Sequence, residues 1–311
     1  SLKDVNDVES FGGRLLLRYA GADGLMVDAS LVGQRIDGAD GQYAEVRWGD
    51  LARSSSIAQP FRNDFLLADI VVRKSWDDLE LTASAAYADQ YVFEQFQGRA
   101  LTDPTNSLVG PAADAAQAIF SQTNRGDMFT AELRLARNSP GGTGWLMAAS
   151  YLRNDADAER SMNVGGSASS LTGVGNKVEE ATAYGEATFA LADNLLATVG
   201  GRLTISHLSG DALDPVLPEQ VLAIDPSAER SRTESQFLPS AALAYRPGAG
   251  LTVFARYQEG FRPGGIAVRR EYVQQFRSDS VHTLESGARY DGADFDVKVS
   301  ASWTDWSDIQ A

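Results

Sequence analysis

The sequence predicts an all-β fold class, a transmembrane antiparallel up-and-down β-barrel with short turns at one end and long loops at the other. Three observations predict it. Stretches of strand length alternate apolar and polar residues, the stretches come in pairs, and the connections are alternately very short and very long. Outer-membrane barrels have this pattern because their periplasmic turns are short and their extracellular loops are longer.

The pairs follow one another along the whole chain. The first pair runs from 11–19 through the turn at 21–24 into 25–36. Later pairs meet at short turns at 75–78, 138–144, 192–194, 247–250 and 291–294. Long polar segments separate the pairs, at about 37–62, 97–125, 161–177, 209–233 and 263–280, well above the median connection of about 4–6 residues. We therefore expect about twelve strands.

Four strands show the alternation most clearly. Their apolar stripes are Phe295, Val297, Val299, Ala301 and Trp303; Leu284, Ala288 and Tyr290; Leu79, Leu81, Ala83, Ala85 and Tyr87; and Leu195, Ala197, Val199, Leu203 and Ile205. Strands of about 10 residues are longer than the 5 to 6 that are usual in globular sheets. Their length suits a tilted crossing of a membrane.

Charged residues lie on the opposite face of these strands, where contact with lipid would be costly, so we expect them to face a wet interior. They include Arg14, Arg18, Glu132, Arg134, Glu186, Arg256, Glu285 and Lys298. Aromatic residues near strand ends fit an interfacial girdle, namely Tyr19, Trp76, Tyr87, Trp145, Tyr151, Tyr245, Trp303 and Trp306. The alternative for these aromatics is the sheet edge of a soluble β-protein.

Composition narrows the function. A mean hydropathy of -0.22 and the lack of an apolar run near 18 residues exclude a transmembrane helix but leave a barrel open. The net charge of -15 disfavours nucleic acid as a partner. The chain has no cysteine, which removes disulfides, thiolate metal sites and thiol catalysis.

No constellation in the sequence predicts catalysis or a cofactor. His207 and His282 fall on different strands, and a triad of His282 with Asp279 and Ser280 lacks the turn that would place a nucleophile. Asp37–Gly41 resembles half of a calcium loop without its closing Glu, so a turn is expected and loop-bound calcium is the alternative. We expect a short helix at Pro111–Phe120. We expect a flexible Gly/Ser loop at Val164–Gly175.

Three motifs near the end of the chain point to a family. Tyr257-Gln-Glu-Gly-Phe-Arg-Pro-Gly-Gly265 ends a predicted strand, Leu284-Glu-Ser-Gly-Ala-Arg follows on the next, and Trp303-Thr-Asp-Trp-Ser-Asp-Ile-Gln310 on the one after. In order, spacing and context they resemble elements of TonB-dependent outer-membrane receptors. The motif positions are Tyr257, Gly260, Phe261, Arg262, Gly264, Gly265, Glu285, Gly287, Trp306, Asp308, Ile309 and Gln310.

The resemblance implies a bacterial outer-membrane receptor, surrounded by lipid, that takes up a scarce nutrient through a barrel of about 22 strands. The nutrient would be a ferric siderophore above all, with haem, cobalamin and saccharide as alternatives, and uptake would draw on the TonB–ExbB–ExbD complex acting on an N-terminal plug. The sequence shows no plug, no energy-coupling box and no terminal aromatic strand. We therefore expect residues 1–311 to be an internal part of one barrel domain.

Ligand contacts are expected from the long loops and the interior ends of strands, where rings and guanidinium groups stack on or hydrogen-bond to a bulky cargo. The candidates are Tyr43, Trp48, Phe61, Tyr91, Phe93, Phe96, Arg262 and Arg269. Two other classes stay open. One is a self-contained twelve-stranded barrel acting as a passive channel, an autotransporter pore or a lipase. The other is a soluble acidic β-rich binding protein.

Overall fold

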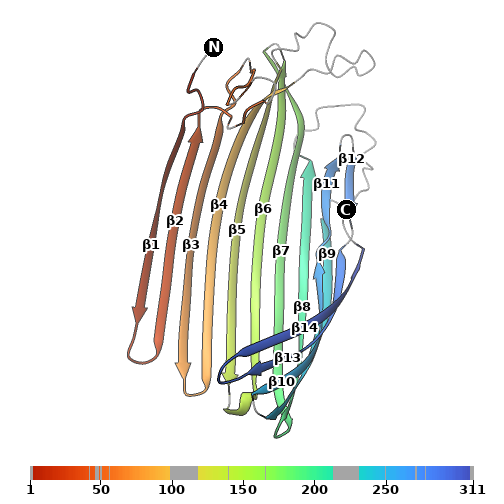
Figure 1. Ribbon diagram of the computed structural model, residues 1–311. Coiled ribbons are helices and arrows are strands. Elements are labelled where there is room, and N and C mark those ends of the chain that lie inside the picture. The colour runs from red at the N-terminus through yellow and green to blue at the C-terminus, as the bar shows by residue number, and fades with distance from the viewer. Residues whose placement is uncertain are drawn as a thin grey trace.

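The computed structural model describes residues 3–41, 43–45, 49, 51–55, 57–98, 118–138, 140–164, 166–212, 231–248, 250–269, 272–276 and 278–308. Twelve strands form one antiparallel sheet in which each strand pairs with its neighbour along the chain (Figure 1). They are β1 (Val8–Ala20), β2 (Leu25–Gly38), β3 (Phe61–Trp76), β4 (Leu79–Gly98), β5 (Ala118–Asn138), β6 (Gly144–Val164), β7 (Ser167–Ala192), β8 (Leu195–Ala212), β9 (Ser231–Gly248), β10 (Leu251–Arg262), β13 (Asp279–Asp291) and β14 (Asp296–Ser307).

The alternation of short and long connections is confirmed except between β6 and β7, where the connection is short. Turns gather at one end of the sheet and the longer connections at the other (Figure 1). At the β1–β2 turn, Gly21 N–H donates to Leu25 O at 2.7 Å and Gly24 has a φ of 81°, a conformation that favours glycine. The Asp23 carboxylate of this turn accepts a bond from Lys74 at 2.6 Å, which ties it to β3.

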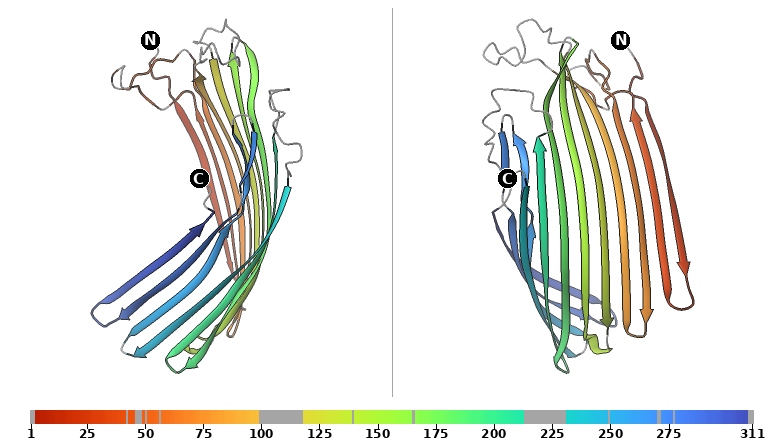
Figure 2. Two further views of the ribbon diagram at one scale, coloured as in Figure 1. Left: turned by 90° about the vertical axis from the view of Figure 1, so that its right-hand side faces the viewer. Right: turned by 180° about the vertical axis from the view of Figure 1, so that it is seen from behind.

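The sheet is curved and does not close on itself within the described residues, since β1 pairs only with β2 and β14 only with β13 (Figure 2). The connection from β10 to β13 holds a second, two-stranded sheet, β11 (Gly265–Arg269) and β12 (Tyr272–Phe276). This hairpin packs against β7 and β8 on the concave side (Figure 2). A 3-10 turn, Pro140–Gly142, lies between β5 and β6. No helix in the described residues is long and apolar enough to cross a membrane.

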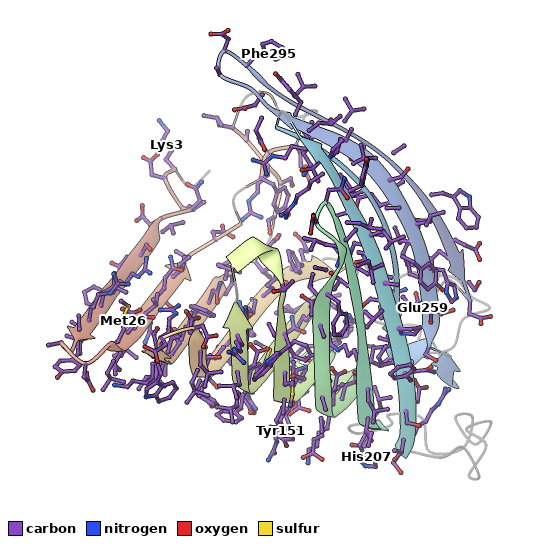
Figure 3. All side chains as sticks on the ribbon, turned by 90° about the horizontal axis from the view of Figure 1, so that it is seen from below. Lys3, Met26, Tyr151, His207, Glu259 and Phe295 are labelled. Atoms are coloured by element: carbon purple, nitrogen blue, oxygen red, sulfur yellow. The ribbon has the colours of Figure 1, made fainter. Side chains whose placement is uncertain are left out.

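The two faces of the sheet differ in chemistry. Side chains alternate between faces along a strand and share a face with their register partners. Tyr151 and His207 stand on the convex side (Figure 3), and the residues that share their face in the register are mainly apolar and exposed. They include Leu31, Ile70, Tyr87, Leu133, Met147, Val199, Leu203, Phe237, Leu243, Leu284, Val299 and Trp303. The predicted stripes therefore form one convex apolar band.

The concave face is polar. Thr182 and Thr204 exchange a hydrogen bond of 3.0 Å, and Ser206 donates to Glu180 at 3.1 Å. Thr204 and Ser206 are fully buried, as expected for a face on which a hairpin packs. Glu132, a charged residue on this face, likewise accepts a hydrogen bond from the Tyr184 hydroxyl at 2.8 Å. A polar concave face and an apolar convex face suit a water-filled interior and a lipid exterior.

One predicted loop is wrong. The described part of Val164–Gly175, and with it most of the connection at 161–177, is strand: β6 runs to Val164, β7 begins at Ser167, and Ser161 pairs with Ser170 after a register shift. Small polar residues on both faces hid the alternation there, while backbone pairing still forms the hairpin. The predicted helix at Pro111–Phe120 lies outside the described residues except for its last three, which begin β5.

Candidate functional site

The interior rim of β3, β4 and β5 carries three phenylalanines near the ends that bear the long connections. Phe61 begins β3, and Phe96 faces Phe120 across the β4–β5 pair. The Phe96 and Phe120 rings stack with centroids 6.4 Å apart. All three share the concave face by register, and Phe96 is 41% exposed. Exposed rings above a polar interior are surfaces on which a bulky cargo can stack.

A polar clasp orders the connection between β2 and β3. Asp40 pairs with Arg53 and accepts hydrogen bonds from the backbone N–H of Gln59 at 2.6 Å and of Gly41 at 2.9 Å. Tyr43 donates to Gln59 Oε1 at 3.0 Å, and the Arg53 guanidinium lies 5.0 Å from the Tyr43 ring centre. Desolvation raises the pKa of the Asp40 carboxyl, but Arg53 and the two N–H donors outweigh it, so the pKa lies below its ordinary value.

The contacts of Asp40 within the clasp disfavour calcium binding by this aspartate. The Asp40 carboxylate is engaged by Arg53, a cation that already neutralises it. Asp37, the other carboxylate of that segment, bonds to Arg35 on the convex face. Within the described part of the chain, no group of three or more His, Asp or Glu residues is arranged to hold a metal ion.

The ends of β10, β13 and β14 meet in a cluster of three interior residues. Arg262 Nη2 donates to Asp279 Oδ2 at 2.6 Å, and its Nε lies 3.2 and 3.1 Å from the two oxygens. Trp306 Nε1 donates to the same Asp279 Oδ2 at 3.1 Å, and the guanidinium lies 5.8 Å from the Trp306 ring centre. Asp279 is 1% exposed. The cluster therefore joins the first and third sequence motifs.

Asp279 was not among the predicted site residues. The sequence offered it only as a partner for His282, but register places the two on opposite faces of β13. His282 instead lies 3.6 Å from Glu259 and 3.3 Å from the Tyr257 hydroxyl on the convex side. No signal in the sequence alone pairs Asp279 with Arg262, because that pairing depends on the register of β10 with β13.

Gly287 of the second motif has a packing role. A Cβ there would lie 2.4 Å from Val299 O and 2.9 Å from the Phe254 ring, which sits opposite it in the register. Gly260 of the first motif differs, because nothing in the described structure lies within 4 Å of its added Cβ. Glu285 faces Arg256 in the register on the interior side.

The predicted ligand contacts fall into three groups. Phe61, Phe96 and Arg262 lie on the interior face, and Tyr43 lies in the β2–β3 connection. Tyr91 and Phe93 share the convex face with Leu81 and Tyr87 by register, so the structure separates them from the interior set. Trp48 lies outside the described residues, as do Ile309 and Gln310, and Arg269 is described only by its backbone in β11.

The fold and the two faces together define the class of transmembrane antiparallel β-barrels. Residues 11–311 match the family model of the TonB dependent receptor-like β-barrel, and the chain belongs to this family. No protein among the curated sequences matches it. The resemblance drawn from the three motifs is thereby confirmed.

Solved structures with the same fold have low sequence identity. The ferric yersiniabactin uptake receptor FyuA from Yersinia pestis is 15% identical, with a TM-score of 0.76 over 97% of this chain and 46% of that one. The ferric citrate transporter FecA is 12% identical, with a TM-score of 0.68 over 97% and 44%. The copper transporter OprC is 12% identical, with a TM-score of 0.61 over 96% and 45%. The chain thus spans about half the length of these structures.

Proposed function

We propose that this chain is part of the barrel domain of a bacterial outer-membrane receptor that takes up an iron–siderophore complex. Family membership and the two chemically distinct faces support the proposal. FyuA and FecA, by name, handle ferric complexes, whereas OprC handles copper, so the shared fold does not fix the cargo. The receptor is proposed to have no enzymatic activity.

The interior rim is the observation that carries the proposed binding site. Phe61, Phe96 and Phe120 present rings at the mouth of a polar interior. The clasp that holds Tyr43 adjoins them in sequence, since its Gln59 comes two residues before Phe61. Rings of this kind bury a large apolar area against a chelate, while a guanidinium supplies directional bonds to its oxygens. Arg262 is 52% exposed at its side chain even though it is paired, so one side of it stays open to a ligand. Trp48 and Arg269 remain proposed contacts.

The whole receptor is proposed to include an interior plug, coupled to TonB–ExbB–ExbD, and the barrel strands that would complete closure. Residues 1–311 are proposed to be part of a single barrel domain that these segments complete. The open edges of β1 and β14 support this, because an unpaired edge in lipid leaves backbone groups without hydrogen-bond partners. A complete twelve-stranded pore would need these two edges to pair, and they do not pair in the described residues.

The test is ligand affinity of the full-length receptor for a panel of ferric siderophores, with a copper complex as the competing cargo. Phe96→Ala is compared with Phe93→Ala, a matched change three residues away on the convex face of the same strand. We expect Phe96→Ala to weaken binding by about tenfold or more, equivalent to about 1.4 kcal/mol, and Phe93→Ala to leave it unchanged. Equal effects would contradict the interior site, and binding of copper alone would contradict the iron cargo.

A further inference from the structure

The convex face has a charged border above its apolar band. On each of six strands, the border is the first charged residue of the convex face between the band and the long connections. Its members are Arg35 on β2, Asp64 on β3, Asp89 on β4, Asp127 on β5, Arg153 on β6 and Glu179 on β7. The residues of the band directly before it are apolar or small, as in Leu31 and Gly33 on β2. On six neighbouring strands, therefore, the apolar band of the convex face ends at a charged residue.

The border descends through the register in regular steps. Arg35 faces Asp64, but Asp64 faces Tyr91, so Asp89 lies two residues lower. Asp89 faces Asp127, but Asp127 faces Asp155, so Arg153 again lies two residues lower. A fall of two residues for every two strands, at about 3.3 Å per residue and 4.8 Å per strand, corresponds to a tilt of about 35°.

That tilt is the one at which barrel strands cross a membrane, about 35–45°. A line that falls through the register at the strand tilt runs around the barrel perpendicular to its axis, at one depth in the membrane. The charged border is therefore a level ring, as expected where the convex face passes from hydrocarbon to headgroups.

Immediately above the border, two guanidinium groups flank one ring. The Arg62 and Arg125 guanidinium carbons each lie 5.6 Å from the centre of the Tyr91 ring, from the strands on either side of β4. Arg62 is also bonded to Asp64 at 2.5 Å. Arg125 is exposed, and among the described residues no carboxylate lies within ion-pair distance of it. Arg153 of the border, in contrast, is paired with Asp155.

We propose that Arg62, Tyr91 and Arg125 form a binding site for the phosphate of a lipid headgroup in the outer leaflet. The inference rests on the proposed membrane location. A guanidinium binds phosphate with two parallel hydrogen bonds. A tyrosine suits headgroup depth because its ring is apolar and its hydroxyl is polar. Arg125 supplies the uncompensated charge, and Arg62 adds the N–H groups that its bonds to Asp64 leave over. Continuity with the apolar band places the acyl chains of the same lipid directly below.

The test uses full-length receptor in detergent, incubated with lipid A that carries both its phosphates, and counts bound lipid by native mass spectrometry. The variants are R125Q and R62Q/R125Q. R134Q is the matched control, because Arg134 lies on the same strand but faces the interior. We expect the double variant to retain at least about tenfold less lipid than the unsubstituted receptor, the loss of about 1.4 kcal/mol, and R134Q to retain the same amount.

Two outcomes would overturn the site: equal retention by all variants, or equal retention of dephosphorylated lipid A. Siderophore binding and heat-modifiable migration are measured on the same samples. If siderophore binding persists while lipid retention is indifferent to Arg62 and Arg125, the lipid site alone has failed. If neither a heat-modifiable barrel nor siderophore binding is found, the proposed function has failed.

Discussion

The guanidinium of Arg262 and the carboxylate of Asp279 form a forked ion pair that closes the base of the β10–β13 connection, with Nη2 and Oδ2 2.6 Å apart. Asp279 also accepts the Trp306 indole N–H at 3.1 Å. One buried carboxylate thus joins three strands and two of the sequence motifs.

We predict that Asp279→Asn destabilises the full-length receptor by about 1.5–3 kcal/mol, because hydrogen bonds to a charged group are lost at a buried position. The measurement is the temperature at which heat-modifiable migration is lost. Asp305→Asn is the control, since Asp305 is an exposed residue of β14 on the convex face. A similar melting temperature for both variants would show that Asp279 has no structural role.

Gly287→Ala is expected to destabilise the barrel by about 1–3 kcal/mol, the usual cost of overpacking. The added methyl would meet Val299 O, a backbone atom that has no room to move aside within a paired ladder. Gly260→Ala, in the neighbouring motif, has open space and should be tolerated. Urea midpoints of the two variants decide the matter, and the reverse order would refute the packing role assigned to Gly287.

An arginine in the middle of the convex band should be far more costly than one at its border. Val199→Arg is expected to cost about 2–4 kcal/mol, and His207→Arg, on the same face of β8, about 0–1 kcal/mol. Val199 is 54% exposed, so the cost would come from lipid and not from crowding. Refolding equilibria in vesicles give both values. Equal costs would mean that the convex face does not contact hydrocarbon.

The β2–β3 clasp should open in acid. The pKa of Asp40 lies below its ordinary value of 3.8 in the folded loop, so its stabilising contribution is complete above that value. The contribution is lost as the pH falls through the lower pKa of the folded state. An environment-sensitive label at Ser54→Cys should therefore report no change down to about pH 4 and a transition below it. The same label in Arg53→Gln should show a loop already altered at neutral pH; an unaltered loop would contradict the clasp.

The sequence was a good guide wherever a strand crosses the apolar band. In Leu79–Tyr87 and Leu195–Ile205, lipid on one side and water on the other force a period of two, and that period is visible in the residues themselves. The short turns were found for a related reason, since glycines such as Gly24 and Gly250 carry the left-handed backbone that tight turns require.

Above the apolar band the period of two is no longer visible, because both faces of the sheet contact water there. The residues of β6 and β7 around Ser161 and Ser170 have no apolar stripe, and only backbone pairing makes them strands. Tyr91 and Phe93 show the other limit. Aromatic identity suggested ligand contact, but the face of a residue depends on its register with β3 and β5, which a single sequence does not contain. The pairing of Arg262 with Asp279 depends on register in the same way.

The continuation of β7 past the band has a consequence for whatever reaches the cell from outside. From Glu179 to Ser167 the strand runs on for twelve residues, about 40 Å along its length, and β6 runs beside it. In the proposed orientation these two paired strands extend the hairpin outward and carry Gly166 beyond the sugars and phosphates of the surface. In that orientation antibodies and other large particles can reach this end of the hairpin, so selection for evasion would act on 166–173.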